Sequence, residues 1–159
     1  MATLAVVTMV LALPLLPWRV LRIKLCNYYG KIVGPVLVWI ARATPVFHHR
    51  ERIAASYPAI YVSNHTSTLD AFIAIWLCPV GGCGVVKKEV ADIPFFGWLY
   101  RLSGHLKVNR SDHQGAVAAL KSTAEVVRRH RLSMWIWPEG TRSRDGRLYR
   151  GHTGPARLA

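Results

Sequence analysis

From residue 50 onward, short apolar runs alternate with longer stretches whose apolar residues recur at helical spacing. Uninterrupted apolar runs are typical of strands buried on both faces, and a strand needs a crossover segment to reach a parallel neighbour. The alternation therefore predicts an α/β domain with a mixed, largely parallel sheet flanked by helices. The expected strands cover residues 59–63, 84–87, 106–108 and 134–137, and the expected helices cover 69–78, 94–102 and 112–131.

Residues 1–49 have a different composition and predict a membrane-anchoring helical segment. Residues 2–18 are apolar and uncharged, but Pro14 and Pro17 interrupt a stretch that is already shorter than the ~20 residues of a spanning helix. A second apolar run, 32–41, is shorter still. We expect two helices that dip into one leaflet, while two core helices of a soluble protein would give a similar pattern. The residues between the runs that suit lipid headgroups are Trp18, Arg19, Arg22, Lys24, Tyr28, Tyr29 and Lys31.

The chain carries 21 Lys and Arg residues against 8 acidic residues, which gives a formal net charge of +13. This excess indicates an anionic partner, which could be nucleic acid, a membrane surface or a phosphorylated substrate. The hydrophobic content of 52% favours a membrane, and no recognised nucleic-acid-binding module is present. Because the histidines other than His65 lack ligand spacing with Cys or carboxylates, we expect no metal site.

Polar residues follow the first expected strand at the point where the next helix begins. The sequence from Asn64 to Asp70 reads NHTSTLD. If the helix starts at Ser67 or Thr68, Asp70 lies in its first turn. Its carboxylate can then accept a hydrogen bond from one ring nitrogen of His65 and leave the other nitrogen free as a general base. A His and an Asp at this spacing also occur by chance, and Ser67 is expected to cap the helix rather than act as a nucleophile.

A second polar segment, residues 138–144 (PEGTRSR), follows the strand expected at 134–137. In a parallel sheet, both polar segments leave the same edge. Gly140 lets the backbone approach a ligand closely, and Arg142 offers a fork of donors that matches phosphate geometry. The segment predicts an anion-binding loop, although a turn with a solvated ion pair could have the same sequence.

The segment between these two clusters has an apolar, aromatic centre and cationic ends. Residues 93–98 read IPFFGW, with Lys87 and Lys88 before them and Arg110 after them. Such a segment can hold an acyl chain or lie on a bilayer while its cations face phosphate. A core helix between two basic surface loops explains the pattern equally well.

Three segments of the chain, in this order and spacing, closely resemble the first three motif blocks of the glycerolipid acyltransferase family, typified by 1-acylglycerol-3-phosphate acyltransferase. The segments are NHTSTLD at 64–70, KKEVADIPFFGW with GHLKVNR between 87 and 110, and PEGTRS at 138–143. Three ordered matches are hard to obtain by chance. Asn109 departs from the acidic residue that the family often has there. The fourth block, which the family places downstream, is not found, so we expect residues 50–159 to form a C-terminally incomplete acyltransferase domain with an incomplete sheet.

The resemblance implies roles for the matching residues. The catalytic pair would be His65 and Asp70. The residues that bind the glycerol phosphate of the acceptor would be Glu139, Gly140, Thr141, Arg142, Lys87, Lys88 and Arg110. The resemblance also implies acyl-CoA or acyl carrier protein as the acyl donor, and it implies neither a metal nor another cofactor.

We therefore expect an enzyme that moves a fatty acyl group from acyl-CoA or acyl carrier protein to the free hydroxyl of 1-acylglycerol 3-phosphate, forming phosphatidic acid in phospholipid biosynthesis. His65 would remove the hydroxyl proton during direct attack on the thioester, without an acyl-enzyme. We expect association with the lipid bilayer, a catalytic domain that faces the cytoplasm, and no nucleic-acid partner. The alternatives are acyl transfer to glycerol 3-phosphate or another lysophospholipid, and a truncated, non-catalytic membrane- or lipid-binding protein.

Overall fold

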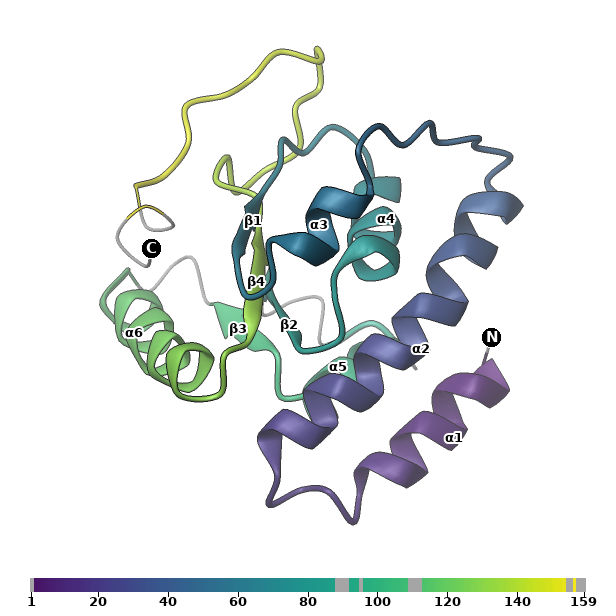
Figure 1. The fold of residues 1–159 in the computed structure, drawn as a ribbon, viewed down its shortest axis with the longest axis vertical. Coiled ribbons are helices and arrows are strands. Elements are labelled where there is room, and N and C mark those ends of the chain that lie inside the picture. The colour runs from purple at the N-terminus through teal and green to yellow at the C-terminus, as the bar shows by residue number, and fades with distance from the viewer. Residues whose placement is uncertain (1, 88–91, 95, 109–112, 154–155, 157–159) are drawn as a thin grey trace.

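The computed structural model describes residues 2–87, 92–94, 96–108, 113–153 and 156. Two N-terminal helices precede a region in which helices and strands alternate (Figure 1). The helices are α1 (Ala2–Ala12), α2 (Arg19–Ile40), α3 (Glu51–Ala55), α4 (Leu69–Leu77), α5 (Phe96–Leu102) and α6 (His113–Arg129). The strands are β1 (Ile60–Val62), β2 (Gly82–Lys87), β3 (Leu106–Val108) and β4 (Ser133–Ile136).

The described strands form one parallel sheet in the order β1-β4-β2-β3. In the register of the central pairings, Ile60 lies opposite Met134, and Gly82 lies opposite Ser133. The predicted largely parallel sheet is confirmed, and each predicted strand is present with small shifts at its ends. Because β4 is the neighbour of β1, the loops that follow these two strands leave the sheet side by side.

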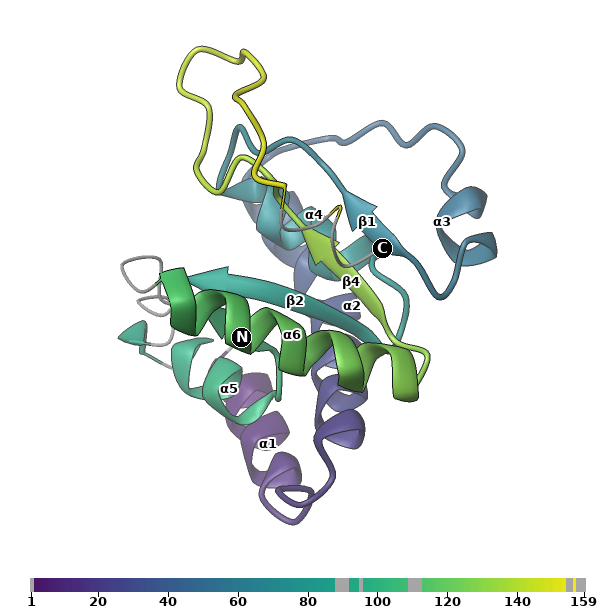
Figure 2. The ribbon, with the colours of Figure 1, turned by 90° about the vertical axis from the view of Figure 1, so that its left-hand side faces the viewer.

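Helices cover both faces of the sheet. Helix α6 lies on one face, and α2 with α4 lies on the other (Figure 1), while Figure 2 shows α6 crossing in front of the strands. Helices α4, α5 and α6 confirm the three predicted helices, although α5 begins two residues later than expected, after Pro94. Residue 112, the predicted start of α6, lies outside the described residues. Helix α3 was not predicted because five residues are too few for a periodic apolar pattern.

The N-terminal segment contains the two predicted helices, but α2 begins at Arg19 and includes the stretch expected among lipid headgroups. Arg22 of this stretch donates to the Leu102 carbonyl at 2.6 Å, and Lys31 donates to the Trp76 carbonyl at 2.8 Å. These carbonyls lie at the C-terminal ends of α5 and α4, where helices leave acceptors unpaired. The two cations therefore join α2 to neighbouring helices, in contrast to the headgroup contacts that we expected for them.

Helix α2 packs closely on α4 through a glycine. A Cβ atom at Gly34 would lie 2.8 Å from both the Phe72 carbonyl oxygen and the Trp76 Cβ. Only a residue without a side chain permits this approach of two helix backbones. Helix α2 is thus a packed layer of the molecule.

The outer surfaces of α1 and α2 carry exposed apolar side chains. They include Val6, Val7, Val10, Leu11, Leu21, Ile32, Trp39 and Ile40. Within the described residues, no helix combines the length and the apolar character that crossing a bilayer requires. Apolar exposure on this scale is typical of a surface that contacts a lipid or protein partner.

Candidate active site

The segment between β1 and α4 brings His65 and Asp70 together. Nδ1 of His65 lies 2.9 Å from Oδ2 of Asp70, and the same oxygen accepts hydrogen bonds from the backbone N–H groups of Thr66 at 2.7 Å and Ser67 at 2.8 Å. Helix α4 starts at Leu69, so Asp70 lies in its first turn, as predicted. The carboxylate therefore folds back over the residues that precede the helix.

Hydrogen bonding keeps Asp70 ionised. Burial raises the pKa of Asp70, but the hydrogen bonds from Ser67, His65 and Thr66 lower it more, and the net pKa lies below the ordinary value of 3.8. An ionised carboxylate only accepts hydrogen bonds, so Nδ1 of His65 carries the proton. The lone pair of the imidazole is then on Nε2, which is the arrangement that a general base requires.

Trp137 packs against the ring of His65. The two ring centroids are 4.8 Å apart and the planes differ by 26°. Trp137 comes directly after β4, and the sequence alone placed it inside the strand expected at 134–137. Its place just before the PEGTRS segment was the signal that could have assigned it to the site. A stacked aromatic ring limits rotation of the imidazole.

The loop after β4 returns to the segment that holds His65. The N–H group of Ser143 donates to the His65 carbonyl at 2.7 Å, and Arg142 donates to Thr68 Oγ1 at 2.5 Å. Gly140 has a φ of 65°, so a residue with a side chain would be strained at this turn. The prediction that both polar segments leave the same sheet edge is confirmed.

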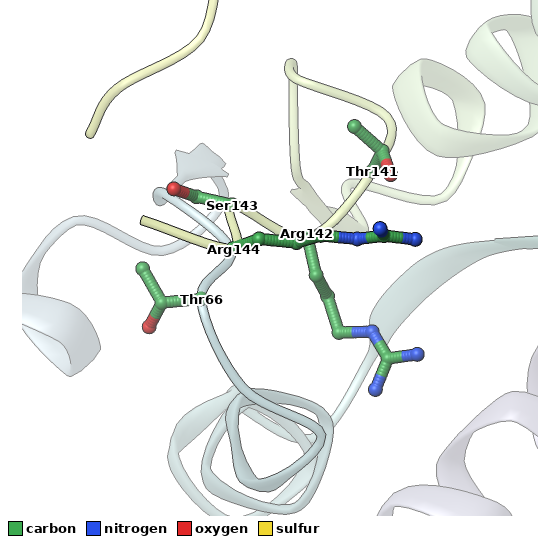
Figure 3. A pocket seen from close by; sticks show the side chains of 5 residues that line it. All are labelled: Thr66, Thr141, Arg142, Ser143 and Arg144. Carbon is green, nitrogen blue, oxygen red and sulfur yellow. The ribbon is translucent and has the colours of Figure 1, made fainter. Parts of the chain in front are cut away.

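A polar hollow of about 360 Å³ lies between the two segments. Figure 3 shows the side chains around it, and two arginines of one loop contribute to the lining. The lining residues are Thr66, Thr141, Arg142, Ser143 and Arg144. None of these lining residues is acidic, so the hollow is suited to an anion. Of its lining residues, Thr141 and Arg142 were predicted as substrate-binding residues, and Ser143 and Arg144 were predicted as part of the anion-binding loop, whereas Thr66 was not predicted to bind.

Glu139, which was also predicted to bind the acceptor, is 8% exposed and does not line this hollow. Its carboxylate accepts hydrogen bonds from the N–H groups of His65 and Tyr149, each at 3.3 Å. Lys87 ends β2. Lys88 and Arg110 lie outside the described residues, and the roles predicted for all three cations remain predictions.

The sequence of the chain was compared with those of known proteins, and it matches one family. The sequence profile of the acyltransferase family matches residues 44–159. The 1-acyl-sn-glycerol-3-phosphate acyltransferase of Limnanthes douglasii is 43% identical over 145 residues, which cover 91% of this chain and 51% of that protein. The protein of the same name from Saccharomyces cerevisiae is 31% identical over 149 residues, with coverages of 81% and 49%.

A solved structure has the same fold. The crystal structure of the 1-acyl-sn-glycerophosphate acyltransferase PlsC from Thermotoga maritima matches with a TM-score of 0.69 and 23% sequence identity. The match covers 86% of this chain and 53% of that chain. The chain spans about half the length of the curated relatives that it matches.

Proposed function

The chain belongs to the acyltransferase family, and from this premise we propose that it transfers a fatty acyl group from a thioester to the free hydroxyl of 1-acylglycerol 3-phosphate, forming phosphatidic acid in phospholipid biosynthesis. The observation that carries the proposal is the His65–Asp70 pair, with its 2.9 Å contact, beside a hollow lined by two arginines. A base and an anion site in such proximity suit an acceptor that bears both a hydroxyl and a phosphate.

The reaction is a direct transfer. Nε2 of His65 takes the proton of the acceptor hydroxyl while the hydroxyl oxygen attacks the thioester carbonyl. The Asp70 carboxylate, 2.9 Å from Nδ1, stabilises the positive charge that then forms on the imidazole. When the carbon–sulfur bond breaks, the imidazolium returns the proton to the departing thiolate, so the products are an ester and a thiol.

The arginine-lined hollow holds the acceptor phosphate. Arg142 and Arg144 present planar groups of N–H donors, and the hydroxyl groups of Thr66 and Thr141 supply further donors. The hydrogen bond from the Ser143 N–H group to the His65 carbonyl holds the phosphate-binding loop at a fixed distance from the imidazole of His65. Binding the phosphate therefore orients the hydroxyl, and orientation accounts for much of the rate in a reaction with a good leaving group.

The donor is acyl-CoA or acyl carrier protein, and the protein works at a membrane surface. The exposed apolar side chains of α1 and α2, with Trp39 at 77% exposure, support contact with a bilayer. The net charge of +13 supports attraction to anionic lipid. The catalytic domain faces the cytoplasm, where thioester donors are supplied.

The test measures thiol release from acyl-CoA by the purified chain in lipid vesicles, with and without 1-acylglycerol 3-phosphate. We expect release that depends on this acceptor and exceeds the release seen with glycerol 3-phosphate or lysophosphatidylcholine. Faster release with either of those compounds would assign a different acceptor. Vesicle binding without any acceptor-dependent release would refute the proposal and favour a non-catalytic lipid-binding protein.

A further inference from the structure

Glu139 is a buried acidic residue whose two carboxylate oxygens accept hydrogen bonds from backbone N–H groups. Oε1 accepts from the His65 N–H group and Oε2 accepts from the Tyr149 N–H group, each at 3.3 Å. With 8% exposure, this carboxylate has both oxygens engaged inside the protein. A carboxylate withdrawn from water is stable only with such partners, because burial of an unpaired charge is costly.

The position of Glu139 argues against contact with the acceptor. Its side chain does not line the hollow that Arg142 and Arg144 help to form. A negative charge beside a bound phosphate would also repel it. The carboxylate instead points to the residue that carries the base.

The peptide groups of His65 are held on both sides by one loop. Glu139 accepts from its N–H group, and Ser143 donates to its carbonyl oxygen at 2.7 Å. The two ends of this loop, residues 138–152, are joined by a hydrogen bond from the N–H group of His152 to the Pro138 carbonyl at 2.9 Å. This second tie keeps the loop in place independently of Glu139.

We propose that Glu139 is a positioning residue that fixes the backbone of His65, and that it does not bind the acceptor. Tyr149 holds one carboxylate oxygen in place, so the other oxygen can hold the His65 N–H group. The position of the His65 backbone determines where Nε2 of its ring meets the acceptor hydroxyl. The contact with Asp70 holds only the other ring nitrogen, Nδ1, and does not fix the backbone. The inference rests on the proposed function, because it assigns Glu139 to the reaction that His65 performs.

The first test compares Glu139→Gln with Glu125→Gln, the same chemical change at an exposed position of α6. Glutamine keeps one acceptor oxygen but turns an NH₂ group toward the other backbone N–H group. We expect kcat to fall roughly 10- to 100-fold in Glu139→Gln, with the KM for 1-acylglycerol 3-phosphate changed less than about 2-fold. Glu125→Gln should match the wild-type protein in both constants. A raised KM with unchanged kcat would overturn the inference, since that pattern indicates lost acceptor binding.

A second readout does not depend on turnover. Backbone hydrogen exchange at His65 and Tyr149 should become about 10-fold faster or more in Glu139→Gln, while exchange in α4 stays as in the wild-type protein. Unchanged exchange at both amides would overturn the inference. Glu139→Asp retains the charge but is one methylene shorter, so it should show the same two exchange increases if the glutamine variant unfolds. A wild-type chain without acyl transfer would refute the proposed function, and hydrogen exchange would still decide the role of Glu139.

Discussion

The side chain of His65 is held at a ring nitrogen by Asp70 and at a ring face by Trp137, and its backbone is held by Glu139 and Ser143. The sequence predicted the first of these contacts because His65 and Asp70 are five residues apart around a helix start. The other three contacts come from the loop after β4, more than 70 residues away. Their geometry depends on the path of that loop, which local patterns do not determine.

The hydrogen bonds to Asp70 make its contribution to stability dependent on pH. The net pKa of the folded carboxyl lies below the 3.8 expected for the unfolded chain, so the folded state binds fewer protons between these two values. The stabilisation is fully present above the unfolded pKa and is lost as the pH falls through the folded pKa. Thermal unfolding of wild-type protein and Asp70→Asn should differ at neutral pH and converge on acidification below 3.8. A difference that stays constant with pH would contradict this account.

The stack between Trp137 and His65 should affect the rate of transfer. Removal of an aromatic partner costs about 1 kcal/mol, which corresponds to roughly a 5-fold change. We expect kcat to fall by about this factor in Trp137→Ala, and Trp137→Phe should retain most of the wild-type value because the aromatic face remains. Equal losses in the two variants would contradict this account, because the aromatic face that phenylalanine retains should preserve most of the rate.

At the level of elements, the parallel sheet and the positions of α4, α5 and α6 were predictable from alternating apolar runs. Helix α2 was predicted too short, because its residues 19–31 are basic and lie outside the apolar run at 32–41. That stretch is helical through tertiary contacts, such as the hydrogen bonds from Arg22 and Lys31 to helix-end carbonyls. Such contacts override local propensity and are not visible in the sequence.

The close packing of α2 on α4 predicts a graded effect of added methyl groups. A Cβ at Gly34 would lie 2.8 Å from the Phe72 carbonyl oxygen, whereas a Cβ at Gly30 would lie 3.0 Å from the Ile75 Cβ. Gly34→Ala should lower the free energy of unfolding by about 1–3 kcal/mol, and Gly30→Ala should lower it by less. Chemical denaturation in mild detergent measures both. The reverse order would indicate that the helices do not pack as described.

At the scale of the whole molecule, helices α1 and α2, which carry the exposed apolar side chains, lie apart from the loop after β4 (Figure 1). Leu11 on α1 is 52% exposed, and Leu148 on that loop is 77% exposed. If α1 and α2 contact the bilayer, Leu11→Asp should weaken sedimentation with anionic vesicles, because it places a charge in the contact. Leu148→Asp introduces the same charge on the loop after β4, away from α1 and α2. This variant should bind vesicles like the wild-type protein. Equal weakening by both variants would point to a purely electrostatic attraction.

The central claim is that His65 is the general base for an acceptor held in the neighbouring arginine-lined hollow. The most direct measurement is thiol release from acyl-CoA over a range of 1-acylglycerol 3-phosphate concentrations, which gives kcat and the acceptor KM for wild-type protein, His65→Ala and Arg142→Ala. The account predicts a loss of roughly 10³-fold or more in His65→Ala. It also predicts that Arg142→Ala mainly raises the KM for the acceptor. A His65→Ala protein with near-normal kcat would contradict it.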